Sequence, residues 1–442
     1  MNELEEGKIS TLLVRYCLPA MAGSLVTALY SIVDQIFIGS AAGVYGNAAS
    51  NVVWPLVIFL TALSLMCGVG VSACMNMAMG RQDTVSARRY TAGGISLMVL
   101  CGLLLSLGVL IFLKPLLYLC GCTDSVFPYA SVYTRILAYG FVFSLISSAG
   151  PFILRADGVP GYALFCTVIG NVLNVLGDYI LVFVLKKGIA GAAWSTVISE
   201  LTGTVLVLAW LPRMKTMRLE KNDFMLRPLY LRNIASAGMG PAMNFLTQTL
   251  SFILINGALK TYGAASVYGS ENVLAAAGVA NKVNTFASAI VTGLTNGMQP
   301  GISYNYGKGH MERVCELGNA VIRLVLAAGF VITFIYQVFP VQIASLFGDG
   351  SPLYFAFAAR YFRIHFALIS LYGLQSSVGG FFSAQRKPLY SMCISMTRQL
   401  ILLPLLLFIL PRFFGIDGVL YSGPLADLGM ACVALSLFKK RV

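Results

Sequence analysis

Charged residues are scarce in this chain. They make up 11% of its 442 residues, whereas hydrophobic residues make up 58%. An ordinary soluble domain carries about 25% charged residues, and a soluble protein this apolar would expose large hydrophobic patches. The composition therefore excludes an ordinary soluble globular protein and favours a chain surrounded by lipid.

Residues that carry catalysis or bind metals are also few. The chain has only two histidines, His310 and His365, and its ten cysteines lack the spacing of a zinc site. It has neither a nucleophile elbow nor a nucleotide-binding loop. We therefore expect no enzymatic activity, no cofactor and no bound metal, except for a coupling ion.

Long apolar segments take up most of the sequence. A helix needs roughly 20 mostly apolar residues to cross the hydrocarbon core. These segments are continuous runs that do not alternate, which favours transmembrane helices over a barrel. We predict an all-α integral membrane protein with twelve spans, at residues 12–38, 51–79, 91–113, 129–153, 162–185, 190–211, 232–259, 272–299, 314–338, 354–382, 389–411 and 417–438.

Lys and Arg give the chain a formal net charge of +13. In a soluble protein this balance would suggest a nucleic-acid partner, but here the basic residues lie at the ends of the apolar segments. Most fall on one side of the membrane, so the positive-inside rule predicts that both termini are cytoplasmic. We expect a multi-pass protein of the inner membrane and no nucleic-acid partner. The other side carries only Lys114, Lys186, Lys187, Lys260 and Arg412.

The two halves of the chain resemble each other. Gly188 to Gly191 recurs as Gly415 to Gly418, 227 residues later, and Pro19-Ala20-Met21 recurs as Pro241-Ala242-Met243. Six helices repeated in the same direction predict two lobes related by a pseudo-two-fold axis along the membrane normal. Such halves suit transport by alternating access. The predicted boundaries are an N-lobe at 1–212, a flexible cytoplasmic connector at 213–231 and a C-lobe at 232–442.

Few carboxyl groups lie within the predicted spans, and two of them are in the N-lobe with suitable neighbours. A carboxylate at the bilayer centre costs about 2.5–3.5 kcal/mol, so Asp34 and Asp178 are functional candidates. Asn174 and Asp178 are i and i+4 and share one helix face. Thr196 lies on the next, antiparallel helix. These oxygens suit a proton relay or a small hard cation; helix-packing hydrogen bonds are the alternative interpretation. Pro19 is expected to bend the first helix.

Other charges are predicted within the remaining spans. Glu200 and Asp427 are repeat equivalents, 227 residues apart, and Arg398 is a candidate partner for Asp427. Snorkelling of Arg398 is the alternative. Lys282 either faces a cavity or snorkels. We group these four residues as a possible substrate cavity or charge network.

Four stretches carry a resemblance to a known family. They are residues 18–21 with Ser31 to Gly39, Asn174 to Phe183, Gly297 to Gly307, and Phe414 to Asp427. In this order and spacing the chain resembles the multidrug and toxic compound extrusion (MATE) family, in its DinF-like prokaryotic branch, over essentially its whole length.

The resemblance implies twelve helices in two lobes around a V-shaped cavity. It also implies export of amphipathic organic cations in exchange for H⁺ or Na⁺, by a protein that we expect to be monomeric. The family's N-lobe cation site falls on Asp34, Asn174, Asp178 and Thr196, and its helix-1 proline on Pro19. Two departures from the family pattern concern either the preferred charge of the substrate or the ion stoichiometry: Glu200 stands where an amide is expected, and Gly423 stands where many relatives carry an acid. A lipid-linked oligosaccharide flippase of the same superfamily is the alternative function.

Overall fold

The computed structural model describes residues 2–347 and 350–441, without the side chains of residues 2, 40–44, 440 and 441. Within these ranges the chain forms helices and no strand. The first half contains α1 (Asn2–Glu6), α2 (Ile9–Leu12), η1 (Leu13–Cys17), α3 (Leu18–Gly80), α4 (Thr84–Ile111), α5 (Leu113–Leu119), α6 (Phe127–Ala156), α7 (Pro160–Asp178), η2 (Tyr179–Val184), α8 (Gly188–Trp210), η3 (Leu211–Arg213) and η4 (Lys221–Phe224). The second half contains α9 (Pro228–Ala264), α10 (Ser270–Lys308), α11 (Met311–Val338), α12 (Pro340–Ser345), α13 (Pro352–His365), α14 (Ile369–Ala384), α15 (Pro388–Met396), η5 (Thr397–Leu402), α16 (Leu403–Phe414) and α17 (Ile416–Arg441).

The predicted all-α membrane fold is confirmed, with one span corrected. Eleven helices of the described chain are long and apolar enough to cross a membrane. The predicted span at 354–382 is not one helix, because α13 ends at His365 and α14 begins only at Ile369. Hydropathy averages over many residues, so it does not reveal a break of three residues, 366–368, within a mostly apolar stretch. Non-helical backbone at this depth is tolerated where it is enclosed by protein, and Phe366 at the break is buried.

The first two predicted spans belong to one helical element. Helix α3 continues through the interval that we expected to separate them, but it reverses direction there. Gln35 donates a hydrogen bond to the side chain of Asn47 at 2.8 Å, whereas a straight helix would separate these residues by about 18 Å. The two arms of α3 are therefore antiparallel neighbours, with candidate spans at Ile9–Gly39 and Tyr45–Gly80.

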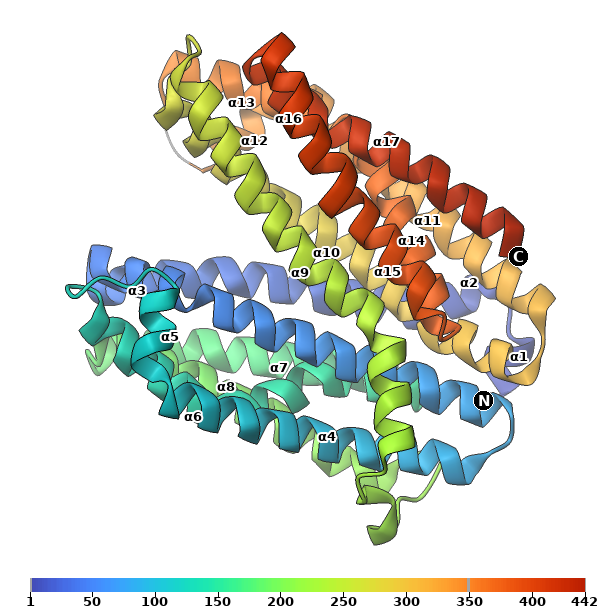
Figure 1. The fold of residues 1–442 in the computed structure, drawn as a ribbon. Coiled ribbons are helices and arrows are strands. Elements are labelled where there is room, and N and C mark those ends of the chain that lie inside the picture. The colour runs from blue at the N-terminus through green and yellow to red at the C-terminus, as the bar shows by residue number, and fades with distance from the viewer. Residues whose placement is uncertain (1, 348–349, 442) are drawn as a thin grey trace.

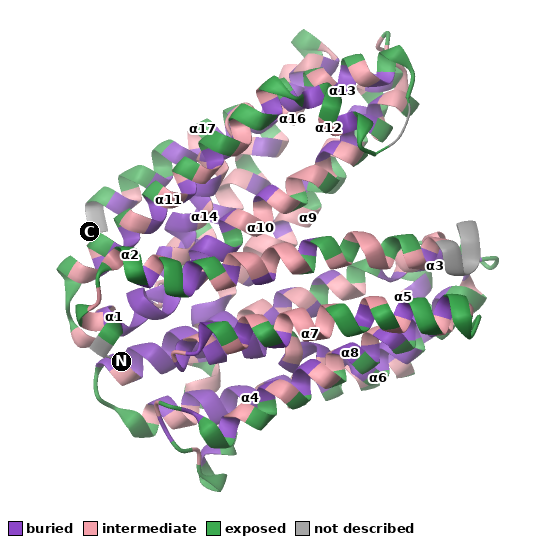
Figure 2. Cartoon of the chain, turned by 180° about the vertical axis from the view of Figure 1, so that it is seen from behind, coloured by how far each residue is buried: buried purple, intermediate pink, exposed green. Residues whose placement is uncertain are grey.

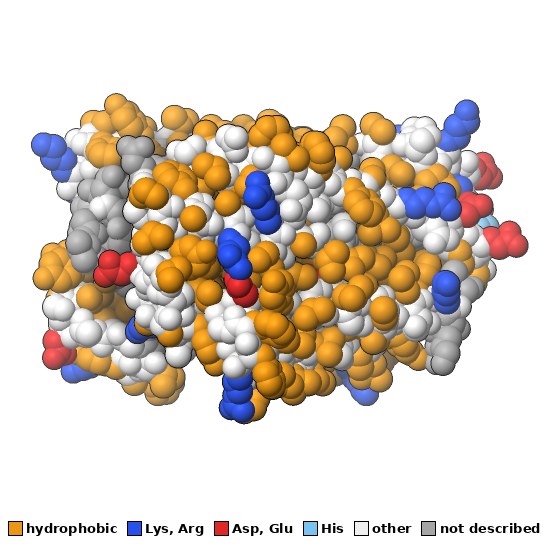
Figure 3. Space-filling model, turned by 90° about the horizontal axis from the view of Figure 1, so that it is seen from above, with side chains coloured by type: hydrophobic (Ala, Val, Ile, Leu, Met, Phe, Trp, Pro, Cys, Tyr) orange, Lys and Arg blue, Asp and Glu red, His pale blue; other side chains and the backbone are white. Residues whose placement is uncertain are grey.

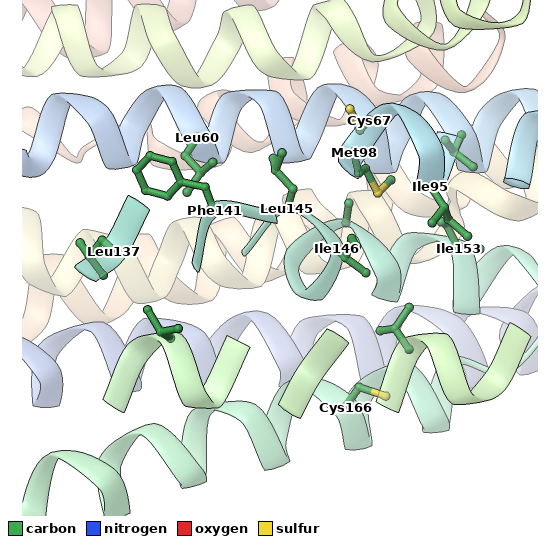
Figure 4. Close-up of a cluster of buried hydrophobic side chains, with 14 of the residues drawn as sticks. Leu60, Cys67, Ile95, Met98, Leu137, Phe141, Leu145, Ile146, Ile153 and Cys166 are labelled. Carbon is green, nitrogen blue, oxygen red and sulfur yellow. The ribbon is translucent and has the colours of Figure 1, made fainter. Parts of the chain in front are cut away.

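The helices form two bundles arranged as a V. Helices α3 to α8 make one bundle and α9 to α17 the other, and the bundles diverge away from the end that holds both termini (Figure 1). The N-lobe core is built from α3, α4, α6, α7 and α8 and includes Leu60, Met98 and Phe141 (Figure 4).

The surface of the V agrees with a lipid environment. Exposed residues follow the outer faces of the bundles, whereas buried ones lie between the helices (Figure 2). The face in Figure 3 is largely uncharged, and its charged side chains lie toward the two ends, with a few near the middle. A largely uncharged surface between charged ends is typical of a membrane-spanning protein.

Three turns with left-handed backbone recur at equivalent positions in the two lobes. Six of the nine described residues in the left-handed region of φ form pairs separated by 227 or 228 residues: Gln82 with Gly309, Gly158 with Arg386, and Gly188 with Gly415. Left-handed backbone is uncommon outside glycine, so its recurrence at Gln82 and Arg386 reflects the shape of the turn. Each lobe therefore has the same turns at equivalent positions.

The lobes touch through glycines at the end where the termini lie. A Cβ atom added to Gly80 would collide with the backbone of Tyr304, and one added to Gly307 with the backbone of Met77. These two contacts are repeat equivalents of each other. The absence of a side chain at both glycines lets α3 and α10 cross in direct backbone contact.

The N-terminal segment packs against the C-lobe. Leu4, Leu12 and Cys17 belong to a buried cluster that also contains Met298 and Leu317. The Leu4 carbonyl accepts from Asn305 at 2.8 Å. The first span therefore begins on one lobe and continues into the other.

The connector is held against the N-lobe by Asp157. This buried carboxylate accepts from the backbone N–H groups of Lys215 and Thr216, both at 3.0 Å, and from the indole of Trp210 at 2.9 Å. Ion pairs from Arg88 to Glu220 and Asp223 fix its later part. The connector that we expected to be flexible is thus anchored through most of its length.

Candidate functional site

Two carboxyl groups from different helices meet inside the N-lobe. Asp34 lies on the first arm of α3, and Asp178 is the last residue of α7. Asp178 is fully buried and Asp34 half-buried. Their side chains are within hydrogen-bonding reach of each other. Because two carboxylate anions repel and neither can donate, this contact requires a shared proton or a bound cation.

Asn174 connects this acid pair to the next helix. It lies one turn before Asp178 and is 1% exposed. In the amide orientation that satisfies its neighbours, its nitrogen donates to Oδ2 of Asp178 at 2.9 Å and its oxygen accepts from the Thr196 hydroxyl at 3.2 Å. The structure thus brings together the four residues that the sequence grouped as a coupling site.

One oxygen of each carboxyl group finds no donor. Oδ1 of Asp34 and Oδ1 of Asp178 are buried without a hydrogen-bond partner in the described part of the chain. A buried polar atom without a partner carries a desolvation cost of about 1–3 kcal/mol. A proton or a small cation bound by these oxygens would offset that cost. No group of three or more His, Cys, Asp or Glu side chains is arranged for a metal ion in the residues described.

Several neighbours of the acid pair were missed from the sequence. Tyr30 and Tyr133 lie close enough to interact electrostatically with Asp34, Asp178 and Glu200. Tyr30 precedes Asp34 by four residues, so helical spacing alone could have identified it. Tyr133 lies on α6, and its spacing in the sequence does not relate it to Asp34 or Asp178.

Glu200 occupies the same lobe, and α6 provides its immediate surroundings. Its Oε1 accepts from the Ser144 hydroxyl at 2.6 Å. Gly140, one turn earlier on α6, would place a Cβ atom 3.4 Å from Oε2. The small residues of α6 therefore make room for this third carboxyl group.

π-helical turns accompany the candidate residues. Segment η1 ends two residues before Pro19, η2 begins directly after Asp178, and η5 contains Arg398. Proline has no N–H to give to the carbonyl four residues earlier, which explains the irregular turn before Pro19. A single π-turn inside a helix is rare and frequent at functional sites. Each of these helices can rearrange its hydrogen bonds locally.

The C-lobe holds the predicted ion pair. Arg398 Nε donates to Oδ1 of Asp427 at 2.6 Å, with the two side chains 13% and 7% exposed. The guanidinium carbon lies 5.2 Å from the ring centroid of Tyr372. Lys282, from the same predicted group, is exposed on α10 and is not brought to this pair. Glu200 is in the other lobe, so the four residues do not form one network.

A membrane protein of two repeated helical lobes, with ionisable residues enclosed in its spans, has the architecture of a secondary transporter. The MatE family model matches residues 19–180 and 241–408. The chain therefore belongs to the MatE family, the multidrug and toxic compound extrusion transporters.

Named relatives span nearly the whole chain. The chain is 22% identical over 437 residues to "Multidrug export protein MepA" of Staphylococcus haemolyticus, covering 98% of this chain and 94% of the relative. It is 23% identical to the protein of that name from Staphylococcus aureus (strain N315), with the same coverage.

Solved structures share the fold. An outward-facing conformation of a multidrug resistance MATE family transporter matches with a TM-score of 0.92 and 22% identity, covering 99% of this chain and 97% of that one. A MATE in the straight conformation matches with a TM-score of 0.92 and 21% identity, with the same coverage.

Proposed function

We propose that this protein is a secondary-active efflux antiporter that exports amphipathic organic cations in exchange for H⁺ or Na⁺. The observation that carries the proposal is the pair of partnerless Oδ1 oxygens on Asp34 and Asp178. They provide a buried acceptor site that becomes satisfied when a coupling ion arrives. Relatives named as multidrug export proteins support the direction of transport and the class of substrate.

Coupling proceeds through the first helix. An ion that enters from the outside binds between Asp34 and Asp178, while Asn174 and Thr196 hold the second carboxyl group in position. The change of charge alters how the first arm of α3 packs against α7. The π-turn before Pro19 lets that arm shift while its start stays on the C-lobe. This shift lowers the affinity for the drug, which leaves, and the ion then moves inward.

The driving force is sufficient for export. A membrane potential supplies about 2.3 kcal/mol per charge per 100 mV. Two such charges sustain a gradient of roughly a thousandfold, since each 1.4 kcal/mol corresponds to a factor of ten.

The remaining expectations concern the cell. We propose a monomer in the inner membrane with both termini in the cytoplasm. In that orientation the lobes are closed on the cytoplasmic side, which is the arrangement of an outward-facing state.

A lipid-linked oligosaccharide flippase is the less favoured candidate. Its pyrophosphate substrate requires a strongly basic cavity, whereas the N-lobe site here is formed by carboxyl groups. The named relatives are export proteins, which also argues against it.

The test is efflux from proteoliposomes loaded with a fluorescent organic cation, with proton and sodium gradients imposed separately. We expect one gradient to drive efflux and the Asp34→Asn variant to lose it while it still folds. Full efflux by that variant would remove Asp34 from the mechanism. Folded wild-type protein that transports with neither gradient would contradict the antiport proposal.

A further inference from the structure

Arg398 has hydrogen-bonding capacity that the fold leaves unused. A guanidinium carries five N–H donors, and the bond from Nε to Asp427 is its only hydrogen bond among the described residues. The side chain is nevertheless only 13% exposed. A carboxylate normally engages a guanidinium through two parallel bonds. The single bond to Asp427 leaves both terminal amino groups available to another anionic oxygen.

A histidine lies beside this guanidinium. His365 is close enough to Arg398 for the two to interact electrostatically, and it hydrogen-bonds the backbone of Leu420. Its Nδ1 atom is buried without a partner. This nitrogen is therefore a second polar atom near the guanidinium that the described part of the chain leaves without a partner.

Gly423 creates the space for this imidazole. A Cβ atom added to Gly423 would lie 2.7 Å from Cε1 of His365, so a side chain here would displace the ring. The absence of a side chain at Gly423 thus lets the imidazole lie against α17.

Aromatic side chains surround Arg398 and His365. Tyr372 lies under the guanidinium, and its hydroxyl is fixed by Gln248 at 2.8 Å. The rings of Tyr361 and Phe366 pack against His365, at 4.8 and 5.3 Å between centroids. Aromatic faces next to a charged group are a frequent design of small-molecule sites.

The two lobes therefore differ in charge at equivalent places. Glu200 and Asp427 are repeat equivalents, but the lobe of Glu200 encloses two further carboxyl groups, those of Asp34 and Asp178, whereas Asp427 is paired with Arg398. The N-lobe site is acidic. The C-lobe site combines its carboxylate with a guanidinium.

We propose that Arg398 and His365 form a C-lobe site for a carboxylate carried by the transported molecule, with Asp427 holding Arg398 in place until that group arrives. The preferred substrates then carry a carboxylate as well as a cationic group. The inference rests on the proposed export function, because it takes the ligand to be the transported molecule.

The experiment is equilibrium binding to purified protein in detergent, without any gradient. The probes are a cationic xanthene dye that has a free benzoate and the methyl ester of the same dye, so that they differ only in the carboxylate. We expect the wild type to bind the acid more tightly than the ester. Arg398→Gln should weaken binding of the acid by about tenfold, the value of one charge-assisted hydrogen bond, and leave the ester unchanged.

Two further variants keep the test decisive if Arg398→Gln does not fold. Asp427→Asn keeps an acceptor for Nε but removes the competing anion, so the affinity for the acid should rise while that for the ester does not. The matched control is Arg360→Gln, which breaks an ion pair with Asp417 at the exposed end of the same lobe. It should leave the affinities for the acid and for the ester unchanged.

Equal affinity of the wild type for acid and ester would overturn the site, as would an unchanged ratio in Asp427→Asn. Equal weakening of both dyes in Arg398→Gln would also overturn it, because it indicates a structural role. Loss of ion-driven efflux alongside a retained preference for the acid would refute the antiport proposal and leave the site standing. Ion-driven efflux without a preference for the acid would refute the site and leave the antiport proposal standing.

Discussion

At the scale of single residues, the N-lobe site depends on hydrogen bonds that cross between α7 and α8. Asn174 is the central member, since it contacts both Asp178 and Thr196. The Thr196 hydroxyl does not touch the carboxyl group, so it acts by positioning the amide.

Replacing Thr196 with valine should therefore weaken coupling without abolishing it. One hydrogen bond contributes about 0.5–1.5 kcal/mol, so we expect the apparent affinity for the coupling ion to fall by up to about tenfold. Efflux measured against the concentration of the ion provides this affinity. Thr202→Val on the same helix is the control, because Thr202 bonds only to the Ile198 carbonyl of its own helix. Equal losses in the two variants would exclude a specific role for Thr196.

The Arg398–Asp427 pair makes a second prediction at this scale. Breaking a buried ion pair leaves one charge uncompensated and costs about 3–5 kcal/mol. We expect Arg398→Met to lower the thermal unfolding temperature strongly and the double variant Arg398→Met/Asp427→Leu to recover most of the loss, because it leaves no buried charge. A double variant no more stable than the single one would show that the charge is not the cause.

At the scale of elements, conformational change is easiest where the helices are irregular. The first span starts on the C-lobe, passes through the π-turn η1 and continues past Pro19 into the N-lobe. This turn is the point where the two anchored parts of one helix can move relative to each other.

Substituting Pro19→Ala should make this region stiffer. The new N–H can bond to the carbonyl of Arg15, which removes the reason for the π-turn, and a proline in a helix costs about 3 kcal/mol. We expect slower efflux with little change in ion binding, and stronger protection of residues 13–19 from hydrogen exchange. Pro241→Ala is the comparison, because Pro241 is the repeat equivalent but lies within continuous α-helix. Faster exchange at residues 13–19 in Pro19→Ala would contradict this account.

At the scale of the whole molecule, the glycine contacts between α3 and α10 close one end of the V. Because these contacts join backbone to backbone, closure is sensitive to a single methyl group. Opening this end is the motion that alternating access requires.

The variants Gly80→Ala and Gly307→Ala should favour the state that is open at this end. Overpacking costs about 1–3 kcal/mol, enough to change the ratio of two such states by roughly 5- to 150-fold. Spin labels at positions 187 and 260, near the opposite end of each lobe, should then lie closer together. Gly108→Ala is the control, since a Cβ atom there meets nothing within 4 Å. Unchanged distances in both interface variants would mean that the glycines do not govern closure.

The sequence by itself determined the membrane fold, eleven of the spans and the repeat, and it grouped the four N-lobe residues that the structure brings together. These follow from local properties: apolar length sets a span, and i to i+4 spacing puts Asn174 and Asp178 on one face. It also suggested a partner for Asp427, which the geometry confirms. Tertiary structure alone decided that the span at 354–382 is broken and that the N-terminal segment packs on the C-lobe. It alone brought Tyr133 to the acid pair and His365 to Arg398. Contacts between helices depend on their tilt and rotation, which packing of the whole bundle sets and local sequence does not.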